Sequence, residues 1–207
     1  LKSLFSSGVV LGFYLRFPSA ELTEFMGYGG FYYVLIDAEH YAFNLETVQC
    51  ITRAAELTGM KPMVRVSTKD PAVILGYLET GIVGIVVPHL VTAEDAREVV
   101  SAVKYPPEGT RGAGSTTRAA HYGLTQSSRE YFTLANQRTL VLGMVEDQEG
   151  ITRLPEILDV EGIDGMAVGK GDLALSMGYP GQTSHPEVNG LVTQANALIA
   201  SSDKALG

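Results

Sequence analysis

Residues 32–40 read YYVLIDAEH, the stretch that most clearly indicates a fold. A short apolar run leads into Ile36, and three ionisable residues follow at once: Asp37, Glu39 and His40. Such a run predicts a buried strand, and parallel α/β folds place their chemistry at the carboxyl ends of strands. A strand that ends in an ordinary solvated acidic turn would give the same pattern. The remainder of the chain decides between these two interpretations.

Composition limits the class of protein. The chain has 207 residues, 45% of them hydrophobic, which is enough for one well-packed domain or most of a larger one. Its formal net charge of −8 argues against nucleic acid or an anionic membrane as a partner. Cys50 is the only cysteine, so no intrachain disulfide can form, and a reducing cytoplasm is the expected location. No uninterrupted run of about 18 apolar residues is present to span a membrane.

Strand-like apolar runs alternate with helical patterns along the whole chain. The opening LKSLFSSGVVLGF predicts a short helix before the first strand. Helix starts are indicated by Asn44, by Thr92 with Asp95, and by Ser184 with Glu187. The expected strands are 9–14, 32–36, 62–66, 84–88, 139–145 and 165–168. The expected helices are 19–26, 45–58, 70–79, 92–103, one through Tyr131 and Leu134, 151–158 and 184–199.

Six strands alternating with helices predict an α/β fold with a parallel sheet. An open doubly wound sheet for nucleotides is disfavoured, because LGFYLRFPSAE has one glycine where the dinucleotide fingerprint needs three. A (β/α)8 barrel is favoured by the long Gly-rich connection over residues 105–123 and by ionisable residues at successive strand ends. A complete barrel needs about 250 residues. The expectation is therefore one barrel domain over residues 1–207 that is truncated after about six βα units and lacks the last two.

Ionisable residues recur at the predicted strand ends and would converge on one rim of a barrel: Asp37, Glu39, His40, Arg65, His89, Glu146 and Asp172. Glu146 and Asp172 form an oxygen-ligand pair suited to magnesium or manganese. A zinc site would require more histidine or cysteine than this rim offers. Each residue alone also has a plain structural explanation, such as an ion pair for Arg65 or a helix cap for Asp172.

Three further features fit a site for an acidic substrate. Gly169 and Gly171 leave backbone N–H groups uncovered, where a substrate carboxylate could dock. Arg65 would supply a fixed positive charge to an oxyanion. His40 is the best-placed proton carrier, because histidine exchanges protons near neutral pH.

Several motifs carry a family resemblance. They are IDAEH, the strand-borne Arg65, VPHL, YPPEGTRGAGS (105–115), the Glu146 strand, LPEILDVEGIDG (154–165) and GKGDLALSMGYPG (169–181). In this order they resemble the metal-dependent class II pyruvate aldolases of the HpcH/HpaI aldolase family, the 4-hydroxy-2-oxo-heptanedioate and 2-dehydro-3-deoxyglucarate aldolases. The resemblance implies a (β/α)8 barrel, a homo-oligomer such as a hexamer or trimer of dimers, and reversible cleavage of 4-hydroxy-2-oxo acids to pyruvate and an aldehyde.

The same resemblance implies roles for individual residues. Glu146 and Asp172 would hold Mg²⁺, Mn²⁺ or Co²⁺, Arg65 would bind pyruvate, and His40 would be the acid/base group. Asp37 or Glu39 would orient His40. Glu79 stands where the family often has an aspartate paired with this histidine. The residues expected to contact substrate are Arg65, Gly169, Lys170, Gly171 and Ser115.

Two departures from the family pattern keep alternatives open. Met144 stands where a glutamine is usual, and Lys170 brings a cation beside the expected metal site. One alternative is an aldolase that forms a Schiff base through Lys170. Another is a catalytically silent barrel module that binds a 2-oxo acid or nothing. A lyase acting on acyl-CoA thioesters is a weaker third alternative, because no basic patch for a nucleotide is evident.

Four other residues are expected to have supporting roles. His121 and His185 are expected in a loop and at a helix start. Arg111 and Arg118, in the long Gly-rich connection, would either screen an acidic substrate tail or pair with carboxylates at a subunit contact.

Overall fold

The computed structural model describes residues 8–207, so the short helix expected at the start of the chain lies outside the described residues. The chain forms two compact units. The first runs up to Val86 and includes Ser101–Leu140, and the second comprises Val87–Val100 and Val141–Gly207. Each unit is described by itself, and a single domain over residues 1–207 stays a prediction.

The first unit is built on parallel strands that lie side by side in chain order. They are β1 (Gly12–Leu15), β2 (Tyr33–Asp37), β3 (Lys61–Arg65) and β4 (Gly84–Val87), which ends at the unit boundary. Nearly every residue of β2, β3 and β4 is buried, as expected for parallel strands covered on both faces. The β2–β3 register sets Asp37 opposite Arg65. The charged ends of the two strands are thus neighbours.

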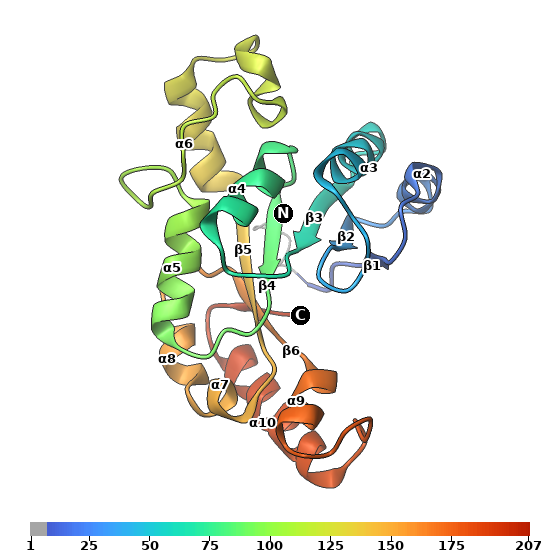
Figure 1. Cartoon of the computed structure of the whole chain (residues 1–207), viewed down its shortest axis with the longest axis vertical. Coiled ribbons are helices and arrows are strands. Elements are labelled where there is room, and N and C mark those ends of the chain that lie inside the picture. Colours follow the sequence, from blue (N-terminus) through green and yellow to red (C-terminus); the bar gives the residue numbers. More distant parts are fainter. Residues whose placement is uncertain (1–7) are drawn as a thin grey trace. The chain divides into compact units, whose positions relative to one another are not determined.

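Helices follow each of these strands. They are α2 (Ala20–Tyr28), α3 (Leu45–Leu57), α4 (Pro71–Glu79), the 3₁₀ turn η1 (Arg118–Gly123) and α6 (Ser128–Arg138). Helices α2 and α3 pack side by side next to β1–β3 (Figure 1). Asn44 caps α3, because its side-chain oxygen accepts a hydrogen bond from the Thr47 N–H at 2.8 Å. This confirms the helix start predicted there.

The second unit holds a shorter run of parallel strands in chain order. They are β5 (Leu140–Val145), β6 (Gly165–Val168) and β7 (Ala205–Leu206). The helices are α7 (Gln148–Thr152), α8 (Leu154–Leu158), α9 (Lys170–Ser176) and α10 (Pro186–Ser201), while α5 (Ala93–Val103) starts in this unit and ends in the first. Helix α10 packs against β6, β7, α8 and α9, with Val188, Ala195 and Ile199 buried (Figure 1). Of residues 8–207, no helix has both the length and the apolar character needed to cross a membrane.

Two local predictions were wrong, and one strand was missed. The single helix expected over 151–158 is two short helices that meet at Arg153, where the proline of LPEIL starts a new first turn. Helix α10 is capped by His185 instead of Ser184, because Pro186 takes the first helical position. The two-residue strand β7 was not predicted, since so short a segment has no apolar pattern of its own.

Candidate active site

A buried ion pair joins the ends of β2 and β3. Arg65 donates from Nε to Asp37 Oδ1 at 2.9 Å and from a terminal nitrogen to Asp37 Oδ2 at 2.6 Å. Asp37 is 2% exposed, and the guanidinium also lies over the Tyr14 ring at 5.8 Å from its centroid. The two-point contact fixes the orientation of the guanidinium. Arg65 is therefore a positioned cation at the strand ends.

The pKa values of this pair reflect the contact. Burial alone would raise the pKa of Asp37, but the hydrogen bond and charge of Arg65 outweigh it, and the pKa is lowered. Burial would likewise lower the pKa of Arg65, and its bond to Asp37 together with the charge of Glu39 raises it instead. Both groups are consequently charged at neutral pH.

Glu39 and His40 complete the charged cluster of the first unit. Arg65 Nε lies 3.1 Å from Glu39 Oε2, and the same oxygen lies 3.6 Å from His40 Nε2. The His40 backbone N–H donates weakly to Asp37 Oδ1 at 3.5 Å. The His40 side chain is 52% exposed. The structure thus places Glu39 beside the imidazole, while the Asp37 carboxylate is occupied mainly by Arg65.

In the second unit, Glu146 projects from the end of β5 into a closely packed position. Its side chain is 1% exposed and accepts a hydrogen bond from the His89 backbone N–H at 2.9 Å. The His89 ring Nδ1 lies 3.4 Å from the same Oε1 atom. His89 has φ of 53°, in the left-handed region that is unusual for a residue with a side chain. This backbone conformation directs both its N–H and its ring at Glu146.

Gly169 makes room for the Glu146 side chain. A Cβ atom at residue 169 would lie 2.6 Å from Glu146 Cβ and 2.9 Å from its Cδ, and closer still to Oε2. Glycine is therefore required here so that α9 can start against the carboxylate. Asp172 lies in the first turn of α9, since the helix begins at Lys170 and Gly169 is its cap. Helix α9 thus carries Lys170, Gly171 and Asp172 in the turn that follows the Glu146 contact.

Glu79 and Ser115 lie in other surroundings. Glu79, at the end of α4, accepts a hydrogen bond from a terminal nitrogen of Arg111 at 2.9 Å. The Arg111 side chain is 2% exposed and stacks over Tyr105, 4.5 Å from the ring centroid. Arg111 therefore pairs with a carboxylate of its own chain, and a role at a subunit contact stays a prediction. Ser115 lies in the loop that leads to η1 and is partly buried.

The residues of the second unit are suited to holding a hard divalent cation. Glu146 offers a buried carboxylate and His89 offers a ring nitrogen 3.4 Å from it. Asp172 lies in the first turn of the adjoining helix α9. Carboxylate oxygens are the preferred ligands of Mg²⁺, and the imidazole also accommodates Mn²⁺. Burying a carboxylate is costly unless hydrogen bonds or opposite charges compensate it, and the His89 N–H supplies one such hydrogen bond to Glu146. A metal ion held by Glu146 and Asp172 stays a prediction.

A parallel α/β fold with acidic and basic side chains at the strand ends is the arrangement of barrel-type enzymes. The chain belongs to the HpcH/HpaI aldolase/citrate lyase family, whose sequence profile matches residues 11–207. It is 39% identical over 198 residues to a 4-hydroxy-2-oxo-heptane-1,7-dioate aldolase of Escherichia coli, covering 95% of this chain and 74% of that protein.

Solved structures support the same family and fold. A HpcH/HpaI aldolase/citrate lyase family protein from Burkholderia cenocepacia J2315 superposes with a TM-score of 0.93 at 28% identity, over 100% of this chain and 82% of that one. Citrate synthase SbnG superposes with a TM-score of 0.87 at 31% identity, over 100% of this chain and 80% of that one. The predicted fold class, a (β/α) barrel type of which this chain carries part, is confirmed.

The sequence placed His89 at the rim, directly after β4, but gave it no defined partner. The left-handed backbone and the contact with Glu146 depend on how the β4 and β5 ends meet, which no local pattern reports.

Proposed function

We propose that the chain catalyses reversible aldol cleavage of a 4-hydroxy-2-oxo acid to pyruvate and an aldehyde, assisted by a divalent metal ion. Membership of the aldolase family supports this function, as does the 39% identity to a 4-hydroxy-2-oxo-heptane-1,7-dioate aldolase. The single observation that carries it is the buried Glu146 carboxylate, which accepts a hydrogen bond from the His89 N–H and fills the space that the missing side chain of Gly169 leaves. A buried carboxylate with an imidazole nitrogen 3.4 Å away offers two donor groups that a divalent metal ion can use.

In this proposal Glu146 and Asp172 hold the metal, with His89 beside them. When bound, Mg²⁺, Mn²⁺ or Co²⁺ would act as a Lewis acid toward the 2-oxo acid and as a template for its oxygens. Backbone N–H groups around Gly169 and Gly171 bind the substrate carboxylate, and Lys170 adds a positive charge there. Ser115 is proposed as a further substrate contact.

Arg65 stabilises the negative charge that builds on the 2-oxo oxygen as the carbon–carbon bond breaks. Its contact with Asp37 keeps the guanidinium in one orientation, so little reorganisation accompanies charge development. His40, with Glu39 next to its ring, takes the proton from the 4-hydroxyl group. Asp37 is thus a positioning residue for Arg65, and Glu39 is one for His40. Glu79 is proposed to help orient the histidine, and its bond to Arg111 is its observed contact.

The proposed partners are a small 2-oxo acid, an aldehyde and further copies of the chain in a homo-oligomer. A cytoplasmic enzyme of this kind needs no nucleic acid and no membrane. The net charge of −8 and the single cysteine favour this assignment.

The test is pyruvate formation from a set of 4-hydroxy-2-oxo acids in the presence of Mn²⁺, followed with lactate dehydrogenase and NADH. Activity that disappears with a chelator and returns with Mn²⁺ supports the proposal. Chelator-resistant activity, with borohydride trapping of pyruvate on Lys170, would replace it with the Schiff-base mechanism. Calorimetric binding of pyruvate and Mn²⁺ without turnover would identify a silent binding module instead.

The likeness to citrate synthase SbnG favours a second reaction of the same family chemistry, carbon–carbon bond formation between a 2-oxo acid and an acyl donor. Incubating the chain with oxaloacetate and acetyl-CoA and measuring free thiol distinguishes it. Thiol release faster than pyruvate release from any 4-hydroxy-2-oxo acid would make that reaction the better assignment.

A further inference from the structure

The first unit contains a cavity away from the strand ends that carry the charged cluster. Ile82 and Val83 precede β4, Thr139 precedes β5, and all three line this cavity of about 170 Å³. It therefore lies at the amino-terminal ends of these strands. In parallel α/β proteins the chemistry lies at the opposite, carboxyl ends. This cavity has no part in the proposed aldol reaction.

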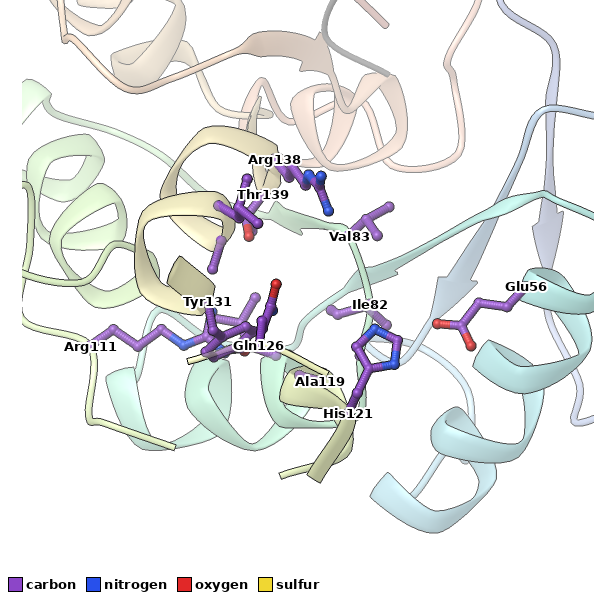
Figure 2. A pocket seen from close by; sticks show the side chains of 14 residues that line it. Glu56, Ile82, Val83, Arg111, Ala119, His121, Gln126, Tyr131, Arg138 and Thr139 are labelled. Atoms are coloured by element: carbon purple, nitrogen blue, oxygen red, sulfur yellow. The ribbon is translucent and has the colours of Figure 1, made fainter. Parts of the chain in front are cut away.

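Polar side chains project into the cavity above an apolar floor. Figure 2 shows Arg138 reaching in from α6, Gln126 from the preceding loop and His121 from η1. Aliphatic residues, including Ile82 and Leu134, also line the cavity, and we call them its floor. An apolar surface with a few convergent polar groups is the usual composition of a site for a small organic molecule.

The charges in the cavity favour an anion. The guanidinium of Arg138 makes no ion pair or hydrogen bond with any residue in the described part of the chain. Glu56, on the opposite wall, is neutralised by its ion pair with Arg118. One uncompensated positive charge therefore remains in the cavity, on Arg138.

A second observation comes from Arg111, which lines the same cavity beside Tyr131 (Figure 2). Arg111 is 6% exposed, and its Nε has no hydrogen-bond partner within residues 8–207. A buried donor without a partner costs about 1–3 kcal/mol and is normally satisfied by water or a ligand. The cavity thus has an unmet donor in its wall as well as a free cation.

The size of the cavity limits the ligand. Pockets for drug-sized ligands occupy about 300–1,000 Å³. The observed 170 Å³ suits a molecule of only several heavy atoms. We propose that this cavity binds a small organic monocarboxylate, with its carboxylate on Arg138 and its short hydrocarbon part on the Ile82 and Leu134 floor. Gln126 and His121 offer further hydrogen bonds to the carboxylate.

The experiment is a titration of the ¹⁵N-labelled full chain with butyrate, followed by amide chemical shifts. Saturable shifts are expected around residues 82–83, 119–126 and 134–139, with a dissociation constant of about 1 mM for one charge-assisted contact and a small apolar surface. Arg138→Gln should raise the dissociation constant for butyrate at least about tenfold. The matched control is Arg129→Gln, an exposed arginine of the same helix that does not line the cavity and whose change should leave the affinity as it is.

Comparison ligands separate the parts of the proposal. 1-Butanol, which lacks the charge, and inorganic phosphate, which lacks the hydrocarbon, should each bind at least several-fold more weakly than butyrate. The proposal is overturned if butyrate gives no saturable shifts at these residues, if Arg138→Gln binds it as well as the original chain, or if either comparison ligand binds equally well. These readouts do not depend on aldolase activity, so the two proposals fail separately.

Discussion

Replacing Gly169 by alanine tests whether the Glu146 carboxylate is held where the structure places it. The added Cβ would lie 2.6 Å from Glu146 Cβ and 2.9 Å from Glu146 Cδ, and Cβ atoms in proteins essentially never approach other atoms within 3.0 Å. The conflict involves the stem of the side chain as well as its tip. Glu146 is 2% exposed and bonded to the His89 N–H, so it has no free space to occupy. Either the start of α9 or the carboxylate must move.

The expected cost follows from this overlap. Inserting a methyl group into a tightly packed position costs about 1–3 kcal/mol. For a chain of 207 residues, a loss of about 3 kcal/mol lowers the melting temperature by about 6–12 °C. The displaced carboxylate should also bind Mn²⁺ more weakly. The affinity should fall about 10- to 100-fold, as it does when residues that position a metal ligand are mutated.

The assays are thermal unfolding by circular dichroism and Mn²⁺ titration by calorimetry. Gly190→Ala is the matched control, because a Cβ there meets no atom within 4 Å and the residue lies on the exposed side of α10. The free energy of unfolding of Gly190→Ala should rise by about 0.4–1 kcal/mol, because alanine is more favourable than glycine within a helix. If Gly169→Ala melts at the original temperature and binds Mn²⁺ unchanged, the described packing of Glu146 is wrong.

Three other changes should have distinct outcomes. Asp37→Asn should cost about 1–3 kcal/mol in urea unfolding at pH 7, because the buried Arg65 loses its two-point charged partner and keeps its contact with Glu39. The exposed Glu149→Gln should cost about 1 kcal/mol or less. Since the pKa of Asp37 is lowered in the folded chain, the Asp37 carboxylate should contribute fully to the free energy of unfolding above about pH 4, and this contribution should disappear as the pH falls further. If the stability lost in Asp37→Asn stays the same in acid, the ion pair between Asp37 and Arg65 is not its cause. Lys104→Met should cost about 1–3 kcal/mol by the same assay, because the buried ammonium donates to two backbone carbonyls at 2.6 and 3.1 Å, and an unchanged stability would contradict this role. His40→Ala should keep its stability, since the ring is half exposed, yet lower the rate of pyruvate formation about 10²- to 10⁴-fold, and a folded variant with full activity would remove His40 from the mechanism.

Much of the fold was predictable because its signals are local. The strands β2 and β3 are short apolar runs that end in charged residues, which predicts buried strands, and nearly all of their residues are buried in the structure. The caps at Asn44 and at Thr92 with Asp95 were also predicted, because a cap depends on residues three positions apart. The break at Arg153 and the strand β7 were missed, since the first depends on the packing of two short helices and the second pairs with β6 only through the backbone.

The sequence predicted which residues lie at the strand ends, but it predicted less well which of their side chains contact one another. Sequence position put Asp37 and Arg65 at neighbouring strand ends, yet the strand register decides that Asp37 bonds Arg65 more closely than His40. Glu79 was expected near the histidine, and the fold of the long connection brings Arg111 to it. Such pairings join residues far apart in the chain, and a single sequence without relatives carries no signal for them.

Glu146→Gln provides the most direct measurement of the central claim. The assay is the initial rate of pyruvate formation from a 4-hydroxy-2-oxo acid with saturating Mn²⁺, for the original chain, for Glu146→Gln and for the exposed control Glu149→Gln. The proposed mechanism predicts pyruvate from the original chain and the control, and at least about a 100-fold lower rate from Glu146→Gln, because a neutral amide oxygen binds a divalent cation much more weakly than a carboxylate does. Full activity of a folded Glu146→Gln variant would contradict a metal-assisted aldolase centred on this residue.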